Sequence, residues 1–186
     1  LALPGAALGG HEIKATALRG VASNGMLCSA RELGLSDDHA GLLELPASAR
    51  PGSGVREALG LEERLLTLKL TPNRGDCLSM LGVAREVAAL TGAKLKSHAP
   101  KPVPAKGKAK HPFRITDAGG CGRFAGRVIR GVDAAAPTPD WMRRRLERAG
   151  QRSISALVDV TNYVMLELGR PLHVYDQDKL AGAIDV

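Results

Sequence analysis

Aromatic side chains are scarce in this sequence, and long apolar runs are missing. Phe, Trp and Tyr together make up only 3% of its 186 residues. So few rings speak against a surface that binds single-stranded nucleic acid by stacking bases on several aromatic side chains. No run of 18 apolar residues occurs, so the sequence contains no candidate transmembrane helix and predicts no membrane partner. The first ten residues, LALPGAALGG, also lack the basic start of a secretory signal.

Cysteine is scarce as well. Cys28, Cys77 and Cys121 are the three cysteines, and no CxxC pair occurs. Their odd number and wide spacing speak against a disulfide framework and against a structural zinc site. P-loop, GxGxxG, GxSxG and HExxH motifs are absent too. The sequence therefore predicts reduced thiols in a cytoplasmic, globular protein that has no metal site.

Acidic residues are missing from one segment, and the excess positive charge gathers there. The formal net charge is +7. From Lys94 to Arg114 there are six Lys and one Arg but no acid, whereas basic and acidic residues are equal in number elsewhere. The Pro- and Lys-rich composition of this segment is typical of a solvated linker, which is our expectation. The alternative is a strap that contacts nucleic-acid phosphates.

Residues 1–70 show the pattern of short strands and Gly-rich turns that is typical of a small β-barrel or part of one. The expected strands are residues 11–20, 41–45 and 65–70. Asn24-Gly25 is expected to form a tight reversal, because both residues tolerate a positive φ.

The most regular pattern predicts a helix that ends at Gly92. Apolar residues recur there at intervals of three and four, which places them on one helical face. They are Cys77, Met80, Leu81, Ala84, Val87 and Ala88. Asp76 is the expected N-cap, and Asn73 and Asp76 are expected to bond turn amides before the helix. Arg85 and Glu86 lie outside the apolar face and are expected to reach neighbouring domains.

Two further helices are expected after the basic segment. The first has Thr138 as its N-cap and Pro139 at its first position. Its expected buried side consists of Trp141, Met142, Leu146 and Ala149. The second covers residues 155–168 and stops at Gly169.

The first of these helices carries four arginines, Arg143, Arg144, Arg145 and Arg148. They could hold phosphate, but we expect a solvated face that pairs with acids such as Glu147. Strands are expected at residues 113–116 and 124–129, and the last residues, AGAIDV, read as the start of another strand.

Three segments together resemble the β subunit of bacterial phenylalanyl-tRNA synthetase. They are ALRGVASNGMLCSARELGL (17–35), LTPNRGDCLSMLGVAREVAALTG (70–92) and SISALVDVTNYVMLELGRPLHVYD (153–176). The first is similar to the end of the tRNA-binding oligonucleotide-fold module of that subunit. The third is similar to the start of its editing domain. The β subunits of this family are several times longer and the chain does not start with Met, so we expect an internal fragment.

The resemblance implies an α+β fold. It consists of the C-terminal part of an oligonucleotide-binding β-barrel, a mixed α/β segment and the start of the editing domain. The expected divisions are 1–70 for the barrel, 71–93 for a connecting helical segment, 94–112 for the basic linker and 113–186 for the incomplete editing domain.

The resemblance also implies a function, which is part of a phenylalanine–tRNA ligase. The editing domain of the family hydrolyses Tyr that is wrongly attached to tRNA(Phe), since a site that accepts Phe rejects an added hydroxyl only weakly. His173 and Asn162 match the motif that lines the editing pocket, and Thr161 is a weaker candidate for the same wall. Each residue has an alternative without a role in editing. His173 could only bond a backbone carbonyl, and Asn162 could be an ordinary amide on a helix surface. Arg170, Val174 and Tyr175 depart from the Gln, Ala and Phe usual there.

Further expectations follow from the same resemblance. Arg19, Ser23 and Asn24 could contact tRNA phosphates, or could belong to an ordinary loop. The partners would be tRNA(Phe) and a catalytic α subunit in an (αβ)₂ heterotetramer. ATP and Mg²⁺ would serve the assembled enzyme, and this chain alone would charge no tRNA. The alternatives are a non-catalytic RNA-binding module and a free-standing trans-editing deacylase.

Overall fold

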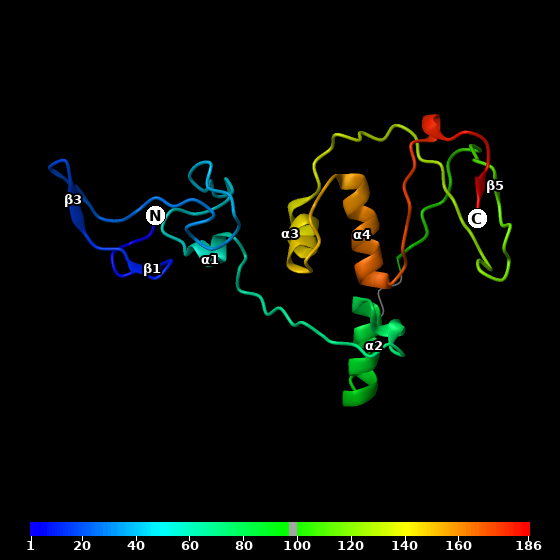
Figure 1. Cartoon of the computed structure of the whole chain (residues 1–186), viewed down its shortest axis with the longest axis horizontal. Helices are drawn as coiled ribbons and strands as arrows, with labels where there is room; N and C mark the ends of the chain where they lie inside the picture. The colour runs from blue at the N-terminus through cyan, green and yellow to red at the C-terminus, as the bar shows by residue number, and fades with distance from the viewer. Residues whose placement is uncertain (97–99) are drawn as a thin grey trace. The chain divides into compact units, whose positions relative to one another are not determined.

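The structure, a computed structural model, describes residues 1–96 and 100–186. The chain forms two units, Leu1–Arg64 and Leu65–Val186, and each is described here by itself (Figure 1). Both helices and small sheets are present, so the architecture is mixed α and β. Within the described residues, no helix is long and apolar enough to span a bilayer.

The first unit is built from two short antiparallel hairpins and one short helix. Its elements are β1 (Ala7–Leu8), β2 (His11–Glu12), β3 (Thr16–Leu18), β4 (Val21–Ser23) and α1 (Val55–Ala58). β1 pairs with β2 and β3 pairs with β4, each pair as a separate two-stranded sheet. The expected strand at 11–20 is thus divided between β2 and β3.

The tight reversal of the first unit lies at Arg19-Gly20. Leu18 faces Val21 across the β3–β4 hairpin, which leaves a two-residue loop. Both loop residues have positive φ, 52° for Arg19 and 79° for Gly20, as a type I′ turn requires. The reversal predicted at Asn24-Gly25 is present only as a bend at Gly25, outside both hairpins.

Gly25 lies where two backbone segments come close together. It lies beside the bridge between Ala2 and Met26 and has a φ of 145°. A Cβ at this position would come within 2.6 Å of the carbonyl oxygen of Ala2. Glycine therefore allows two backbone segments to approach each other here.

Two predicted strands do not form. Residues 41–45 and 65–70 are irregular, although the amide of Leu43 donates to the carbonyl of Cys28 at 2.9 Å. Leu66 in the second segment is 83% exposed. The local pattern suits a strand, but a strand also needs a paired neighbour, which neither segment has in this structure.

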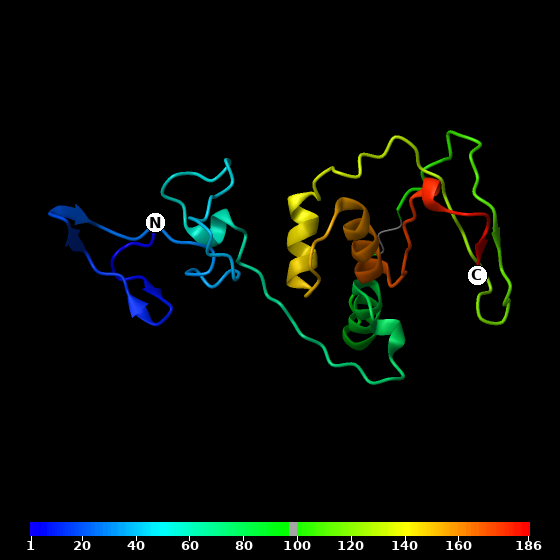
Figure 2. The ribbon, with the colours of Figure 1, turned by 45° about the horizontal axis from the view of Figure 1, so that its top comes forward.

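Most of the regular structure of the second unit is helical. Its elements are η1 (Gly75–Cys77), α2 (Met80–Thr91), β5 (Phe113–Arg114), α3 (Asp140–Arg148), α4 (Ala156–Leu168), η2 (Gln177–Lys179) and β6 (Ile184–Asp185). α3 lies beside α4, and α2 meets the C-terminal end of α4 (Figures 1 and 2). α4 is therefore the central element of this unit.

Serine caps and glycine stops define two of the helices. Ser79 caps α2 by accepting from the amide of Gly82 at 2.9 Å, and Ser155 caps α4. Gly92 and Gly169 end these helices in the left-handed conformation, with φ of 70° and 73°. Both predicted stops are confirmed.

Asp76 is not the N-cap of α2. It lies in the preceding 3-10 turn, where its carboxylate accepts from the guanidinium of Arg74 at 3.1 Å. The 3-10 turn and α2 are in close contact, because a Cβ on Gly82 would lie 1.9 Å from the carbonyl oxygen of Asp76. Ser79 takes the capping position because its hydroxyl lies one turn nearer to the free amides of the helix.

The core of the second unit lies between α3 and α4. Leu146 is fully buried and Met142 is 8% exposed. Trp141 and Ala149 were also expected to be buried but are exposed. The face that α3 presents to the core is thus narrower than its apolar content predicts.

On α2 the predicted apolar face is only partly covered. Met80 is 69% exposed and Val87 is 50% exposed, whereas Cys77, in the turn before the helix, is buried. The contact of α2 with α4 is made at its N-terminal end, where Ser79 lies against Gly169. Most of the helix therefore extends away from this contact.

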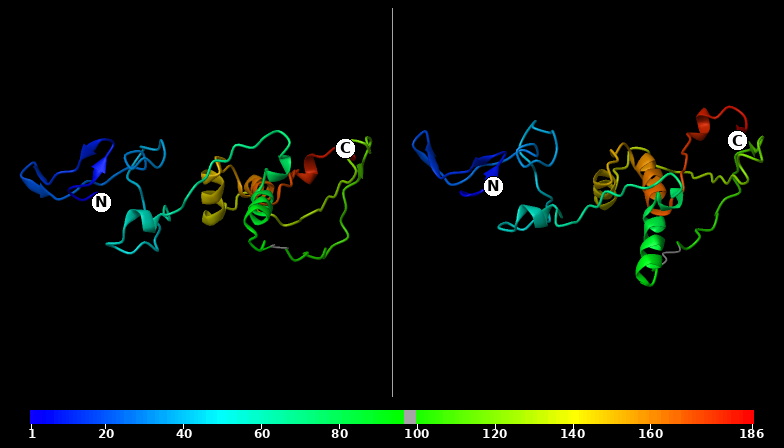
Figure 3. Two further views of the ribbon diagram at one scale, coloured as in Figure 1. Left: turned by 90° about the horizontal axis from the view of Figure 1, so that it is seen from below. Right: turned by 60° about the horizontal axis from the view of Figure 1, so that its bottom comes forward.

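β5 and β6 form a parallel pair that joins distant parts of the chain (Figure 3). Arg114 and Asp185 form a two-point ion pair across it, with N–O distances of 2.7 and 3.1 Å. The predicted strand at 113–116 and the predicted start of a strand at the last residues thus pair with each other. The predicted strand at 124–129 is irregular.

Candidate functional site

The three residues expected to contact tRNA lie on the β3–β4 hairpin of the first unit. Arg19 is exposed at the turn. Ser23 ends β4 at the other end of the hairpin, and its hydroxyl donates to the carbonyl of Gly25 at 3.2 Å. Asn24 follows and is exposed. Arg19 is therefore separated from Ser23 and Asn24 by the length of β4.

The expected editing residues lie on α4 and on the segment that follows it. Thr161 and Asn162 are half-buried, and the Thr161 hydroxyl donates to the carbonyl of Val158 at 2.7 Å. His173 is exposed in an irregular segment, and its ring stacks on Tyr175 with centroids 6.0 Å apart. Across residues 1–96 and 100–186, no hydrogen bond joins His173 to Thr161 or Asn162.

Sequence reasoning missed Asp159, a polar side chain of the second unit. It lies in the first turn of α4 and is fully buried. Its carboxylate accepts from the Thr138 hydroxyl at 2.5 Å, from the Ser153 hydroxyl at 2.6 Å and from the Ile154 amide at 3.0 Å. Three chain segments therefore meet at one carboxylate.

The ionisation of Asp159 follows from these contacts. Burial by itself raises the pKa of a carboxyl, but the hydrogen bonds from Ser153, Thr138 and the backbone amides outweigh it. The pKa of Asp159 therefore lies below its ordinary value. The charged carboxylate is the form that holds the start of α4 in place.

Asp159 also explains an incorrect capping prediction. Thr138 was expected to cap α3, but its hydroxyl is taken up by Asp159, and Pro139 occupies the N-cap position without a side-chain hydrogen bond. An acid early in a helix usually reads as a surface residue near the positive end of the helix dipole. The nearby hydroxyls of Thr138 and Ser153 were the signal that could have revealed its burial.

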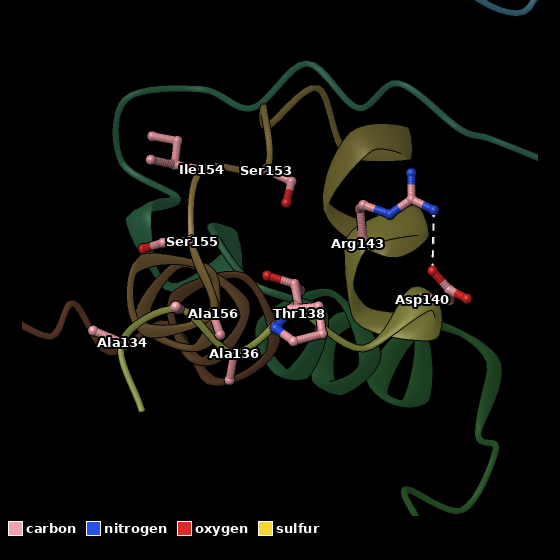
Figure 4. Close-up of a pocket in the computed structure, with 11 residues that line it drawn as sticks. Ala134, Ala136, Thr138, Asp140, Arg143, Ser153, Ile154, Ser155 and Ala156 are labelled. Atoms are coloured by element: carbon pink, nitrogen blue, oxygen red, sulfur yellow. Dashed lines mark hydrogen bonds and ion pairs between the residues drawn. The ribbon is translucent and has the colours of Figure 1, made fainter. Parts of the chain in front are cut away.

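A cleft of about 460 Å³ lies between the start of α3 and the start of α4 (Figure 4). It is lined by Ala134–Thr138, by Asp140 and Arg143, and by Ser153–Ala156. Its two charged residues satisfy each other, because Arg143 donates to Asp140 at 3.1 Å. Thr161, Asn162 and His173 do not line it.

The side chains around Arg74 bond one another within the second unit. Arg74 donates to Asp76 at 3.1 Å and to Glu86 at 2.5 Å, and these hydrogen bonds hold the pKa of both carboxyls below the ordinary range. Glu86 was expected to reach a neighbouring domain, but it joins α2 to the turn before it. Its carboxylate is thereby committed to a contact within the unit.

The remaining candidates for a chemical site are clusters of metal ligands and the three cysteines. In the part of the chain that the structure describes, no three His, Cys, Asp or Glu side chains come together where a metal ion could bind. All three cysteines are free, with Cys28 and Cys77 buried and Cys121 half-buried. The expectation of unpaired thiols is thus confirmed.

Comparison with known proteins defines the class of the chain. Residues 6–54 match a family model described as "Putative tRNA binding domain", and residues 120–186 match the B3/4 domain. These two modules fall in the first and the second unit respectively. The combination is that of a protein with a tRNA-binding module followed by a B3/4 module.

Curated relatives are similar to the chain along its whole length. The chain is 64% identical over 187 residues to the phenylalanine–tRNA ligase β subunit of Bordetella pertussis, and 60% identical over 185 residues to that of Aromatoleum aromaticum. That of Chromobacterium violaceum is 58% identical over 186 residues. Each match covers 100% of this chain but 23–24% of the relative. The chain is thus similar along its whole length to phenylalanine–tRNA ligase β subunits, and it spans about a quarter of the length of these relatives.

Proposed function

We propose that this chain is part of a phenylalanine–tRNA ligase β subunit, in which it contributes tRNA binding and part of an editing site. The observation that carries the proposal is the identity of 58–64% along the whole chain with β subunits of this name. Such identity extends through both units, so it supports a shared role for each of them. The assembled enzyme would join Phe to tRNA(Phe) with ATP.

The proposal assigns a role to each part of the chain. Residues 1–70 would complete an oligonucleotide-binding barrel, and 71–93 would connect it to the next domain. Residues 94–112 would be the basic linker, of which 97–99 lie outside the described residues. Residues 113–186 would begin the editing domain. The tRNA-binding match at 6–54 and the B3/4 match at 120–186 support this order.

The editing chemistry would be hydrolysis of the ester in Tyr-tRNA(Phe). Hydrolysis needs a water held against the carbonyl carbon and a donor for the developing oxyanion. His173 is exposed and follows the helix that carries Asn162, so its imidazole is available to position the water or the terminal ribose. Asn162 would orient His173 or the terminal adenosine, with Thr161 on the same wall. Tyr175, which replaces the usual Phe, stacks on His173 and would fix its ring.

The tRNA contacts of the first unit would include Arg19. Its exposed position at a two-residue turn lets the guanidinium reach a phosphate without desolvating other side chains. Ser23 and Asn24 would contact the same RNA at the other end of β4. The loop alternative remains the simpler one for Ser23, whose hydroxyl already bonds a backbone carbonyl.

The partners would be tRNA(Phe) and a catalytic α subunit in an (αβ)₂ heterotetramer. ATP and Mg²⁺ would act in the aminoacylation site of the α subunit, and we assign no residue of this chain to them. Cytoplasmic localisation is part of the same proposal, since tRNA charging serves protein synthesis.

The test is reconstitution of the β subunit that contains this sequence with its α partner. The expected results are ATP-dependent charging of tRNA(Phe) and hydrolysis of Tyr-tRNA(Phe), while the 186-residue chain alone charges nothing. A subunit that binds tRNA but neither supports charging nor hydrolyses Tyr-tRNA(Phe) would identify an RNA-binding module instead. Hydrolysis of Tyr-tRNA(Phe) by the chain alone would identify a free-standing deacylase.

A further inference from the structure

The only tryptophan of the chain is held in place by the fold without being buried by it. Trp141 lies in the first turn of α3 and is 47% exposed. Its ring meets that of Tyr163 from α4 edge-on, with centroids 5.2 Å apart and planes at 89°. A large apolar ring in this position is costly to expose, and its orientation is nevertheless fixed.

Arg145 completes this arrangement. Its guanidinium carbon lies 5.4 Å from the centroid of the Trp141 ring, and its Nη1 donates to the Tyr163 hydroxyl at 2.7 Å. The guanidinium thus bridges α3 and α4 and lies over one face of the half-exposed Trp141 ring. Few side-chain motions would be lost on binding, because these contacts already restrict the rotamers of all three residues.

Charge is segregated around α3. Trp141, Arg144, Arg145 and Arg148 are spaced at i, i+3, i+4 and i+7, so they share one side of the helix. The two acids of the helix, Asp140 and Glu147, are both ion-paired to Arg143, at 3.1 and 3.6 Å. The side with Trp141 therefore combines one exposed ring with three guanidinium groups and carries no acid. We call this side, defined by these four residues, the Trp141 face.

An exposed aromatic ring beside several arginines is well suited to binding a nucleotide. A base stacks on an aromatic ring whatever its identity, and guanidinium groups bind the adjoining phosphates. The low aromatic content of the chain speaks against a surface that stacks many bases, but one ring is sufficient for one base.

We propose that the Trp141 face binds an unpaired nucleotide of RNA, with its base on Trp141 and a phosphate at Arg144. This proposal rests on the proposed function for the identity of the RNA, which would be tRNA. It adds a contact on the second unit to the tRNA contacts expected from the first. Arg145 holds the ring in the orientation that receives the base.

The sole tryptophan gives a direct readout, because excitation at wavelengths that the two tyrosines do not absorb yields fluorescence from Trp141 alone. Titration with a tRNA(Phe) transcript and with an octauridylate should quench this fluorescence saturably in both cases. A duplex RNA without unpaired bases should quench it much less, because its bases are already stacked on one another. Equal quenching by the duplex would overturn the proposal.

Substitutions distinguish the contribution of the Trp141 ring to RNA binding from that of the arginine charges. The Trp141 variants lack tryptophan, so their binding is measured by the anisotropy of a dye-labelled octauridylate. Trp141→Ala should weaken octauridylate binding on the order of 5- to 150-fold, and Trp141→Phe should recover most of that loss because it keeps a ring. Arg144→Gln should reduce the log–log salt slope of binding by roughly 0.7. Arg130→Gln removes the same charge from an exposed site outside α3 and is the matched control, with tRNA affinity near that of the unmodified chain.

The outcomes also distinguish this proposal from the proposed function. If the reconstituted ligase charges tRNA(Phe) but Trp141→Ala binds both RNAs normally, the Trp141 face is wrong and the function stands. If Trp141→Ala instead releases the α subunit and keeps its RNA affinity, the face is a protein interface and the proposal is also overturned. Failure of charging by the unmodified ligase would refute the proposed function by itself, and octauridylate quenching would still decide the Trp141 face.

Discussion

The longest helix in Leu1–Arg64 is the four-residue α1, whereas Leu65–Val186 contains helices of 12, 9 and 13 residues. The first unit buries Cys28 and Ser29, and its regular structure is two hairpins, a bridge and α1. The second unit buries Leu146 and Met142 between α3 and α4, and it also buries the carboxylate of Asp159. The two units thus depend on different kinds of interaction.

This difference predicts where each unit is sensitive to substitution. In the first unit, the conformations of turn residues such as Arg19 and Gly20 determine the strand pairing. In the second unit, side chains determine the structure, since Asp159 joins three segments and Leu146 fills the helix interface. Substitutions that change backbone freedom should therefore act mainly on the first unit, and substitutions that change side-chain contacts mainly on the second.

The largest expected effect is on the rate of editing. It should be seen for substitutions in the second unit and not for one in the first. His173→Ala, made in the complete β subunit within the ligase, should slow deacylation of Tyr-tRNA(Phe) by about 10²-fold, the low end for a positioned base. Asn162→Ala should act in the same direction, and the double variant should lose less than the product of the two effects. Arg19→Ala in the first unit should leave deacylation at saturating tRNA unchanged. Single-turnover deacylation assays measure all four proteins.

Two controls accompany this prediction. The rate of charging with Phe should stay near that of the unmodified ligase, because the aminoacylation site is proposed to lie on the α subunit. Thermal unfolding of each variant should be measured, since loss of the His173–Tyr175 stack could lower stability and mimic a catalytic effect. Normal deacylation in a well-folded His173→Ala protein would make His173 a structural residue.

The next effect concerns the stability of the second unit. Asp159→Asn places an amide nitrogen among hydrogen-bond donors, so the free energy of unfolding should fall by about 1–3 kcal/mol. Asp37→Asn in the first unit changes the same charge at an exposed position and should have little effect. Urea denaturation followed by circular dichroism measures both. Equal losses in the two variants would contradict the contrast drawn between the units.

The effect of Asp159→Asn should also depend on pH. The pKa of Asp159 is lowered in the folded chain, so its charged form contributes its full stabilisation above the unfolded value of roughly 3.9. That contribution declines as the pH falls from this value toward the folded pKa. The difference in unfolding free energy between the unmodified chain and Asp159→Asn should therefore narrow below roughly pH 4.

The smallest effects compare two glycines. Gly82 in the second unit is limited by space, so Gly82→Ala should cost about 1–3 kcal/mol of unfolding free energy, and Gly82→Asn at least as much. Gly20 in the first unit has open space but a φ of 79°, so Gly20→Ala should cost about 1 kcal/mol and Gly20→Asn less, because Asn tolerates this conformation. Thermal unfolding of the four variants gives the comparison. An Asn that is milder than Ala at Gly82 would show that the backbone and not packing governs that site.

The helices of the second unit could be predicted because their signals are local. Gly92 and Gly169 were correctly identified as stops, since a glycine after an apolar repeat provides the left-handed residue that ends a helix. The start of α4 at Ser155 was also found. The start of α2 was placed three residues too early, because Asp76 and Ser79 are both good caps and the sequence does not show which hydroxyl or carboxylate meets a free amide.

The strands could not be predicted in the same way. Residues 41–45, 65–70 and 124–129 have strand-like composition, but pairing depends on segments elsewhere in the chain. β5 and β6 show this most clearly, because Phe113 finds its partner at Ile184. The sequence shows which residues suit a strand and not which other strand they will meet.

Candidate site residues could be named from the sequence only where they lie in a motif that resembles a known family. Thr161, Asn162 and His173 were chosen from the resemblance, and their roles stay predictions. Asp159 was missed in the sequence because it is a charged residue that is nevertheless buried. Trp141 was expected to be buried because it is apolar, but it is exposed. In both, specific partners override the average preference of the residue type.

The parallel pairing of β5 with β6 has a consequence for folding during synthesis. Arg114 and Asp185 are 71 positions apart, whereas Arg145 on α3 meets Tyr163 on α4 at a separation of 18. Closing the longer loop costs more chain entropy, and β6 leaves the ribosome after both helices. The α3–α4 pair can therefore form while the polypeptide is still growing, and β5 pairs with β6 only after these two helices have met.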